Sequence, residues 1–368
     1  MKNILIICSK LAEKQTGGVQ TRIINYVKNL PKFGLMPILL SLADYSKQSQ
    51  INYFNASLTK IPKNNIFSSF KFLLNKRKII KAIHILEGSL EINQLILLFL
   101  ARFFNITAGI SLYGGEIFDA QLKNNMINTL KLWSALLITK NIIINSKATK
   151  NFIPKYFYNK THIVYPGVNL KLLENKNIKA KNNKINLLYV GRLIRRKGLD
   201  DIIKALKIIT NKFNNISLTV VGKEKNMEIY QNLIEKSELS SYIEFKGETR
   251  DLSKLASYYN NCDIFLMTPK LVFNPSGGFE SFGCVYLEAG LFKKPVIGTN
   301  HFGVKEAIIN NQTGLLVSES NPEEISKAIL KLINNPALRK RLGENNFNRT
   351  IKYFTDINST RQLAKIYL

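Results

Sequence analysis

The chain has few cysteines, histidines and acidic residues, and it has no long apolar run. Its 368 residues include three cysteines, Cys8, Cys262 and Cys284, which form no CxxC pair. This spacing excludes a disulfide framework or a cysteine metal site and indicates reduced thiols in a cytoplasmic protein. The three histidines do not cluster and no Asp-x-Asp pair occurs, so no metal site is predicted.

Long hydrophobic segments are also lacking. The longest, Leu95 to Ala101, is far below the roughly 18 residues that a membrane span needs. The run Ile4 to Cys8 is too short for a signal peptide and has no cleavage site after it, so it is predicted to be a buried strand. Any contact with a membrane should therefore be peripheral.

Positive charge is in excess. The chain carries 53 Lys and Arg against 25 Asp and Glu, a net charge of +28, of which +18 falls in residues 1–180 and +10 in residues 181–368. Such a surface attracts phosphate-bearing ligands or anionic membranes. A composition rich in Lys, Asn and Ile, as an AT-rich genome encodes, accounts for part of the excess. Because no nucleic-acid-binding module accompanies the charge, no nucleic-acid partner is expected.

Short apolar runs alternate with longer segments of helical period, which is typical of βαβ units and a parallel sheet. The predicted strands form two series: 4–7, 37–42, 82–86, 107–112, 142–145 and 162–164, then 185–190, 217–221, 243–245, 264–267, 295–298 and 314–317. Two doubly wound α/β domains with a cleft between them are expected. The expected organisation is an N-terminal domain 1–170, a linker 171–184, a C-terminal domain 185–345, and a terminal helix over 346–368 that packs back on the N-terminal domain.

A basic, glycine-containing loop follows the first strand of the second series. The run Val190-Gly191-Arg192-Leu193 leads through Lys197-Gly198 into a predicted helix. A glycine at the carboxyl end of a strand lets a ligand approach the backbone, and Arg192 and Lys197 would place two cations beside it. This pattern suits a diphosphate, although a solvated basic loop would show the same residues.

A second cluster runs from Glu280 to Glu288. Gly283 lies where a helix could begin, so the backbone amides of Cys284 and Val285 would point their partial positive charge at a phosphate. Two glutamates at this spacing are commonplace by themselves. Here they follow a glycine-rich loop and precede an apolar strand, which favours a site.

These segments, in this order, resemble the retaining GT-B glycosyltransferases of family 4, the group 1 glycosyl transferases. The resemblance covers nearly the whole chain and implies an α/β fold with two Rossmann-like, doubly wound domains that face each other across a cleft. It also implies that the first domain handles the acceptor and that the second binds a nucleotide-sugar donor. The segments that carry it are Gly17-Gly18-Val19, Val190 to Leu193, Lys197-Gly198, Val221-Gly222, Glu280 to Glu288, Lys294 to Gly298, and Glu306 to Val317.

The resemblance implies a role for each matching position. Arg192 and Lys197 would neutralise the diphosphate of a UDP-sugar or GDP-sugar. Glu280 would contact hydroxyls of the donor sugar, and Glu288 would accept hydrogen bonds from the ribose. Members retain the anomeric configuration and generally need no divalent metal or other cofactor. The remaining donor-binding positions that it implies are Gly17 and Gly18 in a loop that closes over the donor, Gly191, Gly222 beside the base, and Gly283, Cys284 and Val285 at the phosphate.

One position departs from the family pattern. Tyr113 stands where members often carry a histidine that reaches the reacting centre. A tyrosine can hydrogen-bond a sugar hydroxyl, but its usual pKa near 10 makes it a poor base at neutral pH. Tyr113 is a candidate catalytic residue together with Arg192, Lys197 and Glu280. The main hypothesis is a hexosyltransferase-type enzyme, and the alternative is a non-catalytic relative that acts as a basic membrane- or glycan-binding scaffold.

The acceptor side offers one further signal. Residues 70–81 mix cations with apolar side chains, as a helix lying on an anionic membrane would, and a solvated helix with a core-facing stripe has the same pattern. The first interpretation predicts a cytoplasmic enzyme in peripheral contact with the anionic inner membrane. Its acceptor would be a hydroxyl of a cell-surface glycan or of a lipid-linked molecule.

Overall fold

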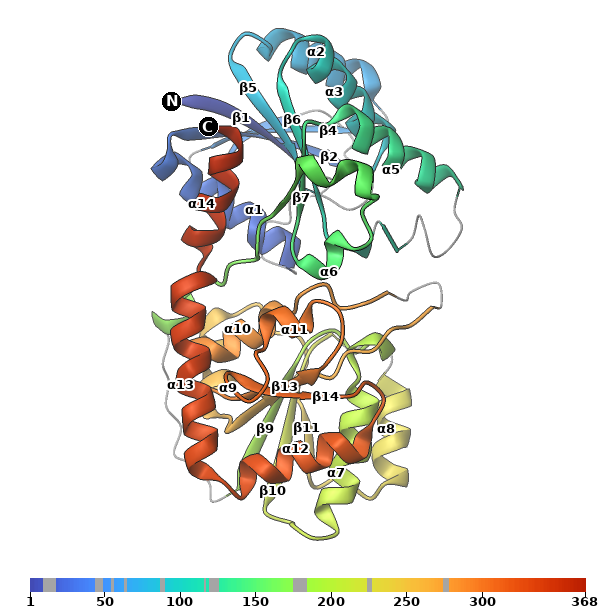
Figure 1. The fold of residues 1–368 in the computed structure, drawn as a ribbon, viewed down its shortest axis with the longest axis vertical. Coiled ribbons are helices and arrows are strands. Elements are labelled where there is room, and N and C mark those ends of the chain that lie inside the picture. Colours follow the sequence, from blue (N-terminus) through green and yellow to red (C-terminus); the bar gives the residue numbers. More distant parts are fainter. Residues whose placement is uncertain are drawn as a thin grey trace. The chain divides into compact units, whose positions relative to one another are not determined.

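The computed structural model describes the chain except for residues 9–17, 44–48, 54–55, 63–64, 87–89, 116, 119–125, 175–183, 224–226 and 274–277. The described residues form two compact units (Figure 1). The first unit is Met1–Gly167 with Asp356–Leu368, and the second unit is Val168–Thr355. Each unit has its own sheet, mostly parallel in the first unit and parallel in the second, and the chain enters the second unit and returns from it once.

The first unit has an eight-stranded sheet in the order β3-β4-β2-β1-β5-β6-β7-β8. The strands are β1 (Lys2–Cys8), β2 (Leu35–Ala43), β3 (Ser49–Tyr53), β4 (Ala56–Pro62), β5 (Ile80–Ile85), β6 (Thr107–Leu112), β7 (Asn141–Ile144) and β8 (Thr161–Ile163). Among these strands only β3 runs antiparallel to its neighbour. The six strands expected in this unit are confirmed to within two residues at each end. The edge pair β3–β4 was not predicted.

Strand β1 shows why this unit has a core on each side of its sheet. Leu5 and Ile7 belong to one core, with the helices α2 (Ile66–Lys76), α3 (Ile92–Phe103) and α5 (Met126–Ile138). Ile4 and Ile6 belong to the other, with α1 (Gly18–Asn29) and α14 (Asp356–Tyr367). Because successive side chains of a strand point to opposite faces, one continuous apolar run fills both layers. The shorter helices are η1 (Leu30–Phe33), α6 (Lys147–Lys150) and η2 (Lys155–Lys160).

His84 lies inside β5 and is fully buried. Its Nδ1 lies 2.6 Å from the hydroxyl of Tyr367 on α14, and its Nε2 lies 3.0 Å from Oγ of Ser111 on β6. Gly109 makes room for this arrangement, since a Cβ there would lie 2.0 Å from the Tyr367 hydroxyl. The histidine therefore ties the last helix to the centre of the sheet.

Burial lowers the pKa of His84 to about 3, and the charge of Arg22 acts in the same direction. In the unfolded chain a histidine has a pKa near 6.5 and takes up a proton that the folded state excludes. The free energy of unfolding should therefore fall as the pH drops from about 6.5 towards 3, by up to about 1.4 kcal/mol per pH unit. We expect His84→Gln to flatten this dependence. Denaturation at each pH is followed by the fluorescence of Trp133, which is the single tryptophan and belongs to the first unit. Parallel pH profiles of unfolding free energy for the parent and the variant would show that His84 does not cause the dependence.

The second unit has a six-stranded parallel sheet in the order β11-β10-β9-β12-β13-β14. The strands are β9 (Ile185–Val190), β10 (Ile216–Val221), β11 (Ile243–Phe245), β12 (Ile264–Leu266), β13 (Val296–Thr299) and β14 (Gly314–Val317), and all six expected strands are confirmed. The order runs outward from β9 to β11 and then returns to β12 on the other side of β9. Right-handed connections on either side of this reversal lie on opposite faces of the sheet, which is the doubly wound arrangement.

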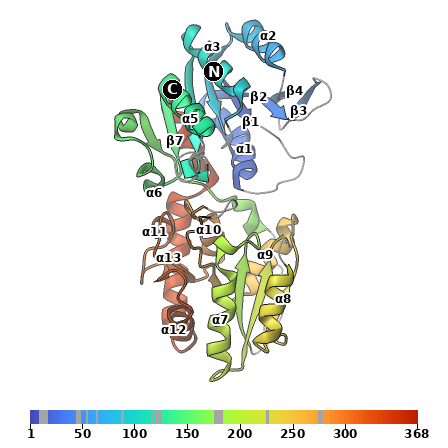
Figure 2. The same cartoon turned by 90° about the vertical axis from the view of Figure 1, so that its right-hand side faces the viewer.

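Helices flank this second sheet in two groups. Helix α7 (Leu199–Thr210) packs beside α8 (Met227–Lys236) and α12 (Pro322–Ile333), and α10 (Cys284–Leu291) packs beside α13 (Pro336–Tyr353) (Figure 2). The strand order reverses between β9 and β12, and open α/β sheets bind ligands at the carboxyl ends of the strands on either side of such a reversal. The remaining helices are η3 (Leu170–Glu174), η4 (Arg195–Lys197), α9 (Leu252–Asn261) and α11 (Val304–Ala307).

Two segments expected as single helices are divided. Residues 346–368 contain the last turns of α13 and the separate helix α14, because the chain between them pairs with Val168, whose amide donates to the Phe354 carbonyl at 2.8 Å. Residues 70–81 contain the second half of α2, a turn and the start of β5, because Ile80 pairs with Asn3 of β1. None of the helices within the described ranges is both long and apolar enough to cross a membrane.

Candidate functional site

The loop after β9 is shaped by close contacts between backbones. Gly191 follows the last residue of β9, and Gly222 follows the last residue of β10. A Cβ on Gly222 would lie 1.8 Å from the Gly191 carbonyl oxygen, so only glycine lets the two strand ends meet. Farther along the loop, Gly198 has a φ of +73° and ends η4 just before α7 begins. These glycines place a short basic turn at the carboxyl edge of the sheet.

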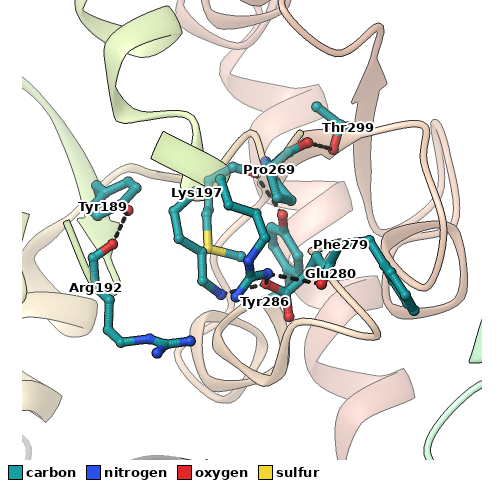
Figure 3. A network of polar contacts seen from close by, with 10 residues as sticks. Tyr189, Arg192, Lys197, Pro269, Phe279, Glu280, Tyr286 and Thr299 are labelled. Carbon is teal, nitrogen blue, oxygen red and sulfur yellow. Dashed lines mark hydrogen bonds and ion pairs between the residues drawn. The ribbon is translucent and has the colours of Figure 1, made fainter. Parts of the chain in front are cut away.

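That turn carries two cations to one carboxylate (Figure 3). The Nζ of Lys197 donates to Oε2 of Glu280, and Nη1 of Arg196 donates to the same oxygen at 3.3 Å. Nη1 of Arg196 also donates to the Phe279 carbonyl at 2.9 Å. The three charged side chains are only 12–14% exposed. The structure therefore brings the predicted residues Lys197 and Glu280 together and adds Arg196 to them.

The electrostatics of this cluster favour its charged state. Burial acts to raise the pKa of Glu280, but the charges of Lys197 and Arg196 outweigh it and lower the pKa. Burial lowers the pKa of Lys197, and Glu280 opposes that shift. Two cations against one carboxylate leave a net positive charge in a poorly solvated place. Such a place attracts an anion more strongly than an exposed lysine does.

Arg192 lies apart from this cluster. Its carbonyl accepts a 3.1 Å hydrogen bond from the Tyr189 hydroxyl, while its side chain extends into solvent and has no hydrogen-bond partner among the described residues (Figure 3). Desolvation and the nearby charge of Arg196 lower the pKa of Arg192. The structure thus places Arg192 beside the cations without joining it to Glu280, and its guanidinium is available to a ligand.

The next element of the site is the start of helix α10. Gly283 caps it with a φ of +91°, and a Cβ there would lie 2.5 Å from the ring of Tyr286. The buried Tyr286 is held by a 2.6 Å bond from its hydroxyl to the Met267 carbonyl. The backbone amides of Cys284 and Val285 are in the first turn, where no intrahelical acceptor exists for them. The predicted position of this helix start is confirmed.

Glu288 lies one turn farther along α10 and belongs to a separate contact. Its Oε2 accepts a 2.7 Å hydrogen bond from the hydroxyl of Tyr259 on α9. The buried Tyr259 ring stacks on Phe292 with centroids 5.8 Å apart. Burial raises the pKa of Glu288, and the Tyr259 bond opposes the rise. The two predicted glutamates therefore have opposite pKa shifts.

The segment after β12 supports the basic turn and carries no motif that the sequence reveals. Oγ1 of Thr268 donates to the Gly198 carbonyl at 3.0 Å, and the backbone amide of Lys270 donates to the Arg196 carbonyl at 2.9 Å. The Nζ of Lys270 lies 2.7 Å from a carboxylate oxygen of both Asp200 and Asp201. These contacts come from a strand distant in sequence, so only the fold shows them.

The remaining candidates belong to the first unit. Gly17 lies outside the described residues, and Gly18 is the first residue of α1. Tyr113 follows β6, and the guanidinium of Arg22 lies 4.6 Å from the centroid of its ring. No group of three or more His, Cys, Asp or Glu side chains within the described part of the chain could hold a metal ion.

Comparison with known proteins places the chain in a family. The family model described as "Glycosyl transferases group 1" matches residues 172–349. An uncharacterized glycosyltransferase of Methanocaldococcus jannaschii is 30% identical over 337 residues, which cover 89% of this chain and 88% of that protein. A capsular polysaccharide biosynthesis glycosyltransferase of Staphylococcus aureus is 30% identical over 197 residues, 53% of this chain and 49% of that one.

Solved structures agree on the fold. The Anabaena protein HepE, crystallised in complex with UDP, superposes with a TM-score of 0.75 at 16% identity and covers 99% of both chains. Two parallel α/β units of the doubly wound type are the GT-B architecture. With this fold and these sequence matches, the chain belongs to the group 1 glycosyl transferases.

Proposed function

We propose that this glycosyltransferase moves a sugar, with retention of configuration and without a divalent metal, from a nucleotide diphosphate sugar to a hydroxyl of a cell-surface glycan or lipid-linked acceptor. The observation that carries the proposal is the largely buried cluster of Arg196, Lys197 and Glu280 at the carboxyl end of β9. Its net positive charge is suited to a diphosphate and can stabilise the charge that develops as the glycosidic bond breaks.

Each element of the site has a place in this proposal. Lys197 and the solvent-facing Arg192 bind the diphosphate, and the first turn of α10 adds backbone donors to a phosphate. Glu280 orients Lys197 and accepts from hydroxyls of the donor sugar. Glu288 accepts from the ribose. Gly191 and Gly222 let the nucleotide approach the strand ends. UDP and UDP-glucose bind to the Anabaena protein, which supports a UDP-sugar, and a GDP-sugar is the alternative donor.

Retention follows in this proposal from attack on the same face of the sugar. The bond between the anomeric carbon and the leaving phosphate oxygen breaks, and the acceptor oxygen forms a bond to that carbon. The acceptor proton passes to the leaving diphosphate, which Lys197 and Arg192 hold. Tyr113 would hydrogen-bond a sugar hydroxyl rather than act as a base, because the usual pKa of a tyrosine is near 10.

A transfer assay with product analysis tests the proposal. The full chain is incubated with UDP-glucose, UDP-N-acetylglucosamine or GDP-mannose, with glycan and lipid-extract acceptors, and with or without EDTA. We expect one donor to give a product whose anomeric proton coupling matches that of the donor, at the same rate in EDTA. Inversion, or loss of transfer in EDTA, would contradict it. Nucleotide binding without any turnover would instead favour the non-catalytic scaffold.

The two arginines should separate binding from stability. Arg192→Ala should lower kcat/KM by about tenfold with little change in Tm, because an exposed guanidinium contributes a charge that water partly screens. Arg196→Ala should also lower Tm by several degrees, because it removes the Arg196 hydrogen bond to the Phe279 carbonyl and one of the two cations that donate to Glu280. Thermal unfolding and steady-state rates measure both effects. Equal losses of Tm in the two variants would contradict the placement of Arg192 in solvent and of Arg196 against Glu280.

Tyr259→Phe tests the role of Glu288. The hydroxyl of Tyr259 holds down the pKa of Glu288, so its removal should raise that pKa further. If the carboxylate binds ribose, nucleotide affinity falls as the pH drops through this pKa, and in the variant the fall should begin at a higher pH. Calorimetric titration with UDP or GDP between about pH 5 and pH 8 measures it. The neighbouring Tyr258→Phe is the control, and identical profiles for both variants would contradict the role.

A further inference from the structure

Helix α5 in the first unit is apolar on both sides. Leu132, Ala135 and Leu136 face the core, as expected for a helix that covers a sheet. On its outer side Leu130 is 61% exposed and Leu137 is 57% exposed. A helix that is apolar all round is normally buried, whereas the outer side of a surface helix is normally polar. The outer side of α5 therefore has the composition of a contact surface.

Helix α3 continues this surface and reverses the usual pattern. Its polar residues Asn93 and Gln94 are buried, while Phe99 is 61% exposed and Phe103 is 74% exposed. Helices α3 and α5 pack against each other, so their outer sides form one surface. We call this surface the apolar face, made of Phe99, Phe103, Ile127, Leu130, Trp133 and Leu137. Contiguous exposed apolar patches mark sites of interaction with proteins or membranes.

The three helices α2, α3 and α5 carry charge of one sign. Helices α2, α3 and α5 contain no Asp or Glu and carry Lys71, Lys76, Arg102 and Lys131. At the carboxyl ends of α3 and α5, Arg102 and Lys140 line a hollow of about 290 Å³. Its lining residues Arg102 and Ile138 are next in sequence to Phe103 and Leu137 of the apolar face. The hollow is large enough for a phosphate group. Apolar side chains beside cations complement a lipid surface with negative headgroups.

The aromatic residues at the border fit the same partner. Trp133 packs against Phe157 of η2 with ring centroids 5.5 Å apart, and the neighbouring Tyr156 is largely exposed. Trp and Tyr are favoured where a bilayer meets water, because one part of the ring is apolar and the other is polar. A second copy of this chain is a poorer partner, since it would bring cations against cations.

We propose that the apolar face of α3 and α5 binds the surface of an anionic phospholipid bilayer, with Arg102 and Lys140 at the headgroup phosphates. The role of this membrane contact rests on the proposed function, because the enzyme would meet a lipid-linked acceptor at the bilayer surface. The membrane contact predicted for residues 70–81 is therefore assigned to a different surface. Helix α2 contributes its basic side chains, and α3 and α5 contribute the apolar side chains that enter the lipid interface.

Trp133 makes the test direct, because it is the single tryptophan of the chain and lies on the apolar face. The full chain is titrated with vesicles of phosphatidylglycerol and phosphatidylcholine, or of phosphatidylcholine alone. Binding should shift the emission of Trp133 to the blue and let brominated lipids quench it with anionic vesicles only. Phe99→Ser with Phe103→Ser should lower the partition coefficient by about tenfold or more. Ile229→Ser, an exposed apolar residue of α8 in the second unit, is the control and should leave it unchanged.

Three outcomes would overturn the proposal: no shift with anionic vesicles, equal binding to neutral vesicles, or a blue shift that grows with protein concentration in the absence of lipid. The last would assign the face to a second copy. Titration of the same samples with UDP and GDP keeps the two proposals apart. If vesicles do not bind but a nucleotide does, only the proposal for the apolar face is rejected. If vesicles bind but no nucleotide does, only the proposed donor site is rejected.

Discussion

Lys197→Ala should lower kcat/KM for sugar transfer by about 10²–10³-fold, the scale seen when one preorganised electrostatic donor is removed from an active site. Lys197 is only 14% exposed, donates to Glu280 and lies in the turn that places two cations at the end of β9. Its removal takes away a charge for the leaving diphosphate and leaves Glu280 with Arg196 as its remaining cation. Steady-state kinetics with the donor identified by the transfer assay measure the loss.

Lys207→Ala is the matched control for this loss. Lys207 is a lysine of the same unit, paired with the largely exposed Glu238, so its substitution should change kcat/KM by less than about twofold. Lys197→Ala combined with Glu280→Gln should cost less than the two separate losses together, because both act through one contact. A folded Lys197→Ala protein with the parent's kcat/KM would remove the cluster from the mechanism.

Gly198→Ala should destabilise the second unit by more than about 2 kcal/mol and abolish transfer. Gly198 has a φ of +73°, and a Cβ there would lie 1.8 Å from the carbonyl oxygen of Thr268. The contact is with backbone, so no side-chain rotation relieves it. The turn must move away from β12, which also displaces Lys197.

Gly34→Ala separates the conformational cost from the collision. Gly34 has a similar φ of +78° but nothing within 4 Å of the position of its Cβ. Its substitution should therefore cost only the left-handed backbone term, about 1–2 kcal/mol. Thermal and chemical unfolding of both variants measures the difference. A Gly198→Ala protein no less stable than the Gly34→Ala protein would contradict the close approach.

The strands were predictable where they are buried on both faces. Both central strands, β1 and β9, are short runs of apolar residues between polar segments, which is the pattern of an interior parallel strand. Strands β3 and β4 are not predictable in this way, because both mix polar with apolar residues, including Lys60 and Pro62. Neither is a continuous apolar run, so their sequence carries a weaker signal.

The site was predictable in its location but not in its pairing. The sequence pointed to Lys197 and Glu280, which the structure joins, and to Arg192, which stands apart from them. It could not identify Arg196, because residues 195–197 are all basic and successive side chains of a 3₁₀ turn point about 120° apart. Only packing against the segment after β12 decides which side chain turns inward. The roles of Thr268 and Lys270 are not predictable from the sequence for the same reason.

The central claim is that the second unit binds the diphosphate of a nucleotide sugar through its own cations. Isothermal titration calorimetry of the full chain with UDP and GDP, with and without EDTA, tests it most directly. We expect one nucleotide to bind, EDTA to leave the affinity unchanged, and Lys197→Ala to weaken it. Binding of neither nucleotide, or binding that requires a divalent metal, would contradict it.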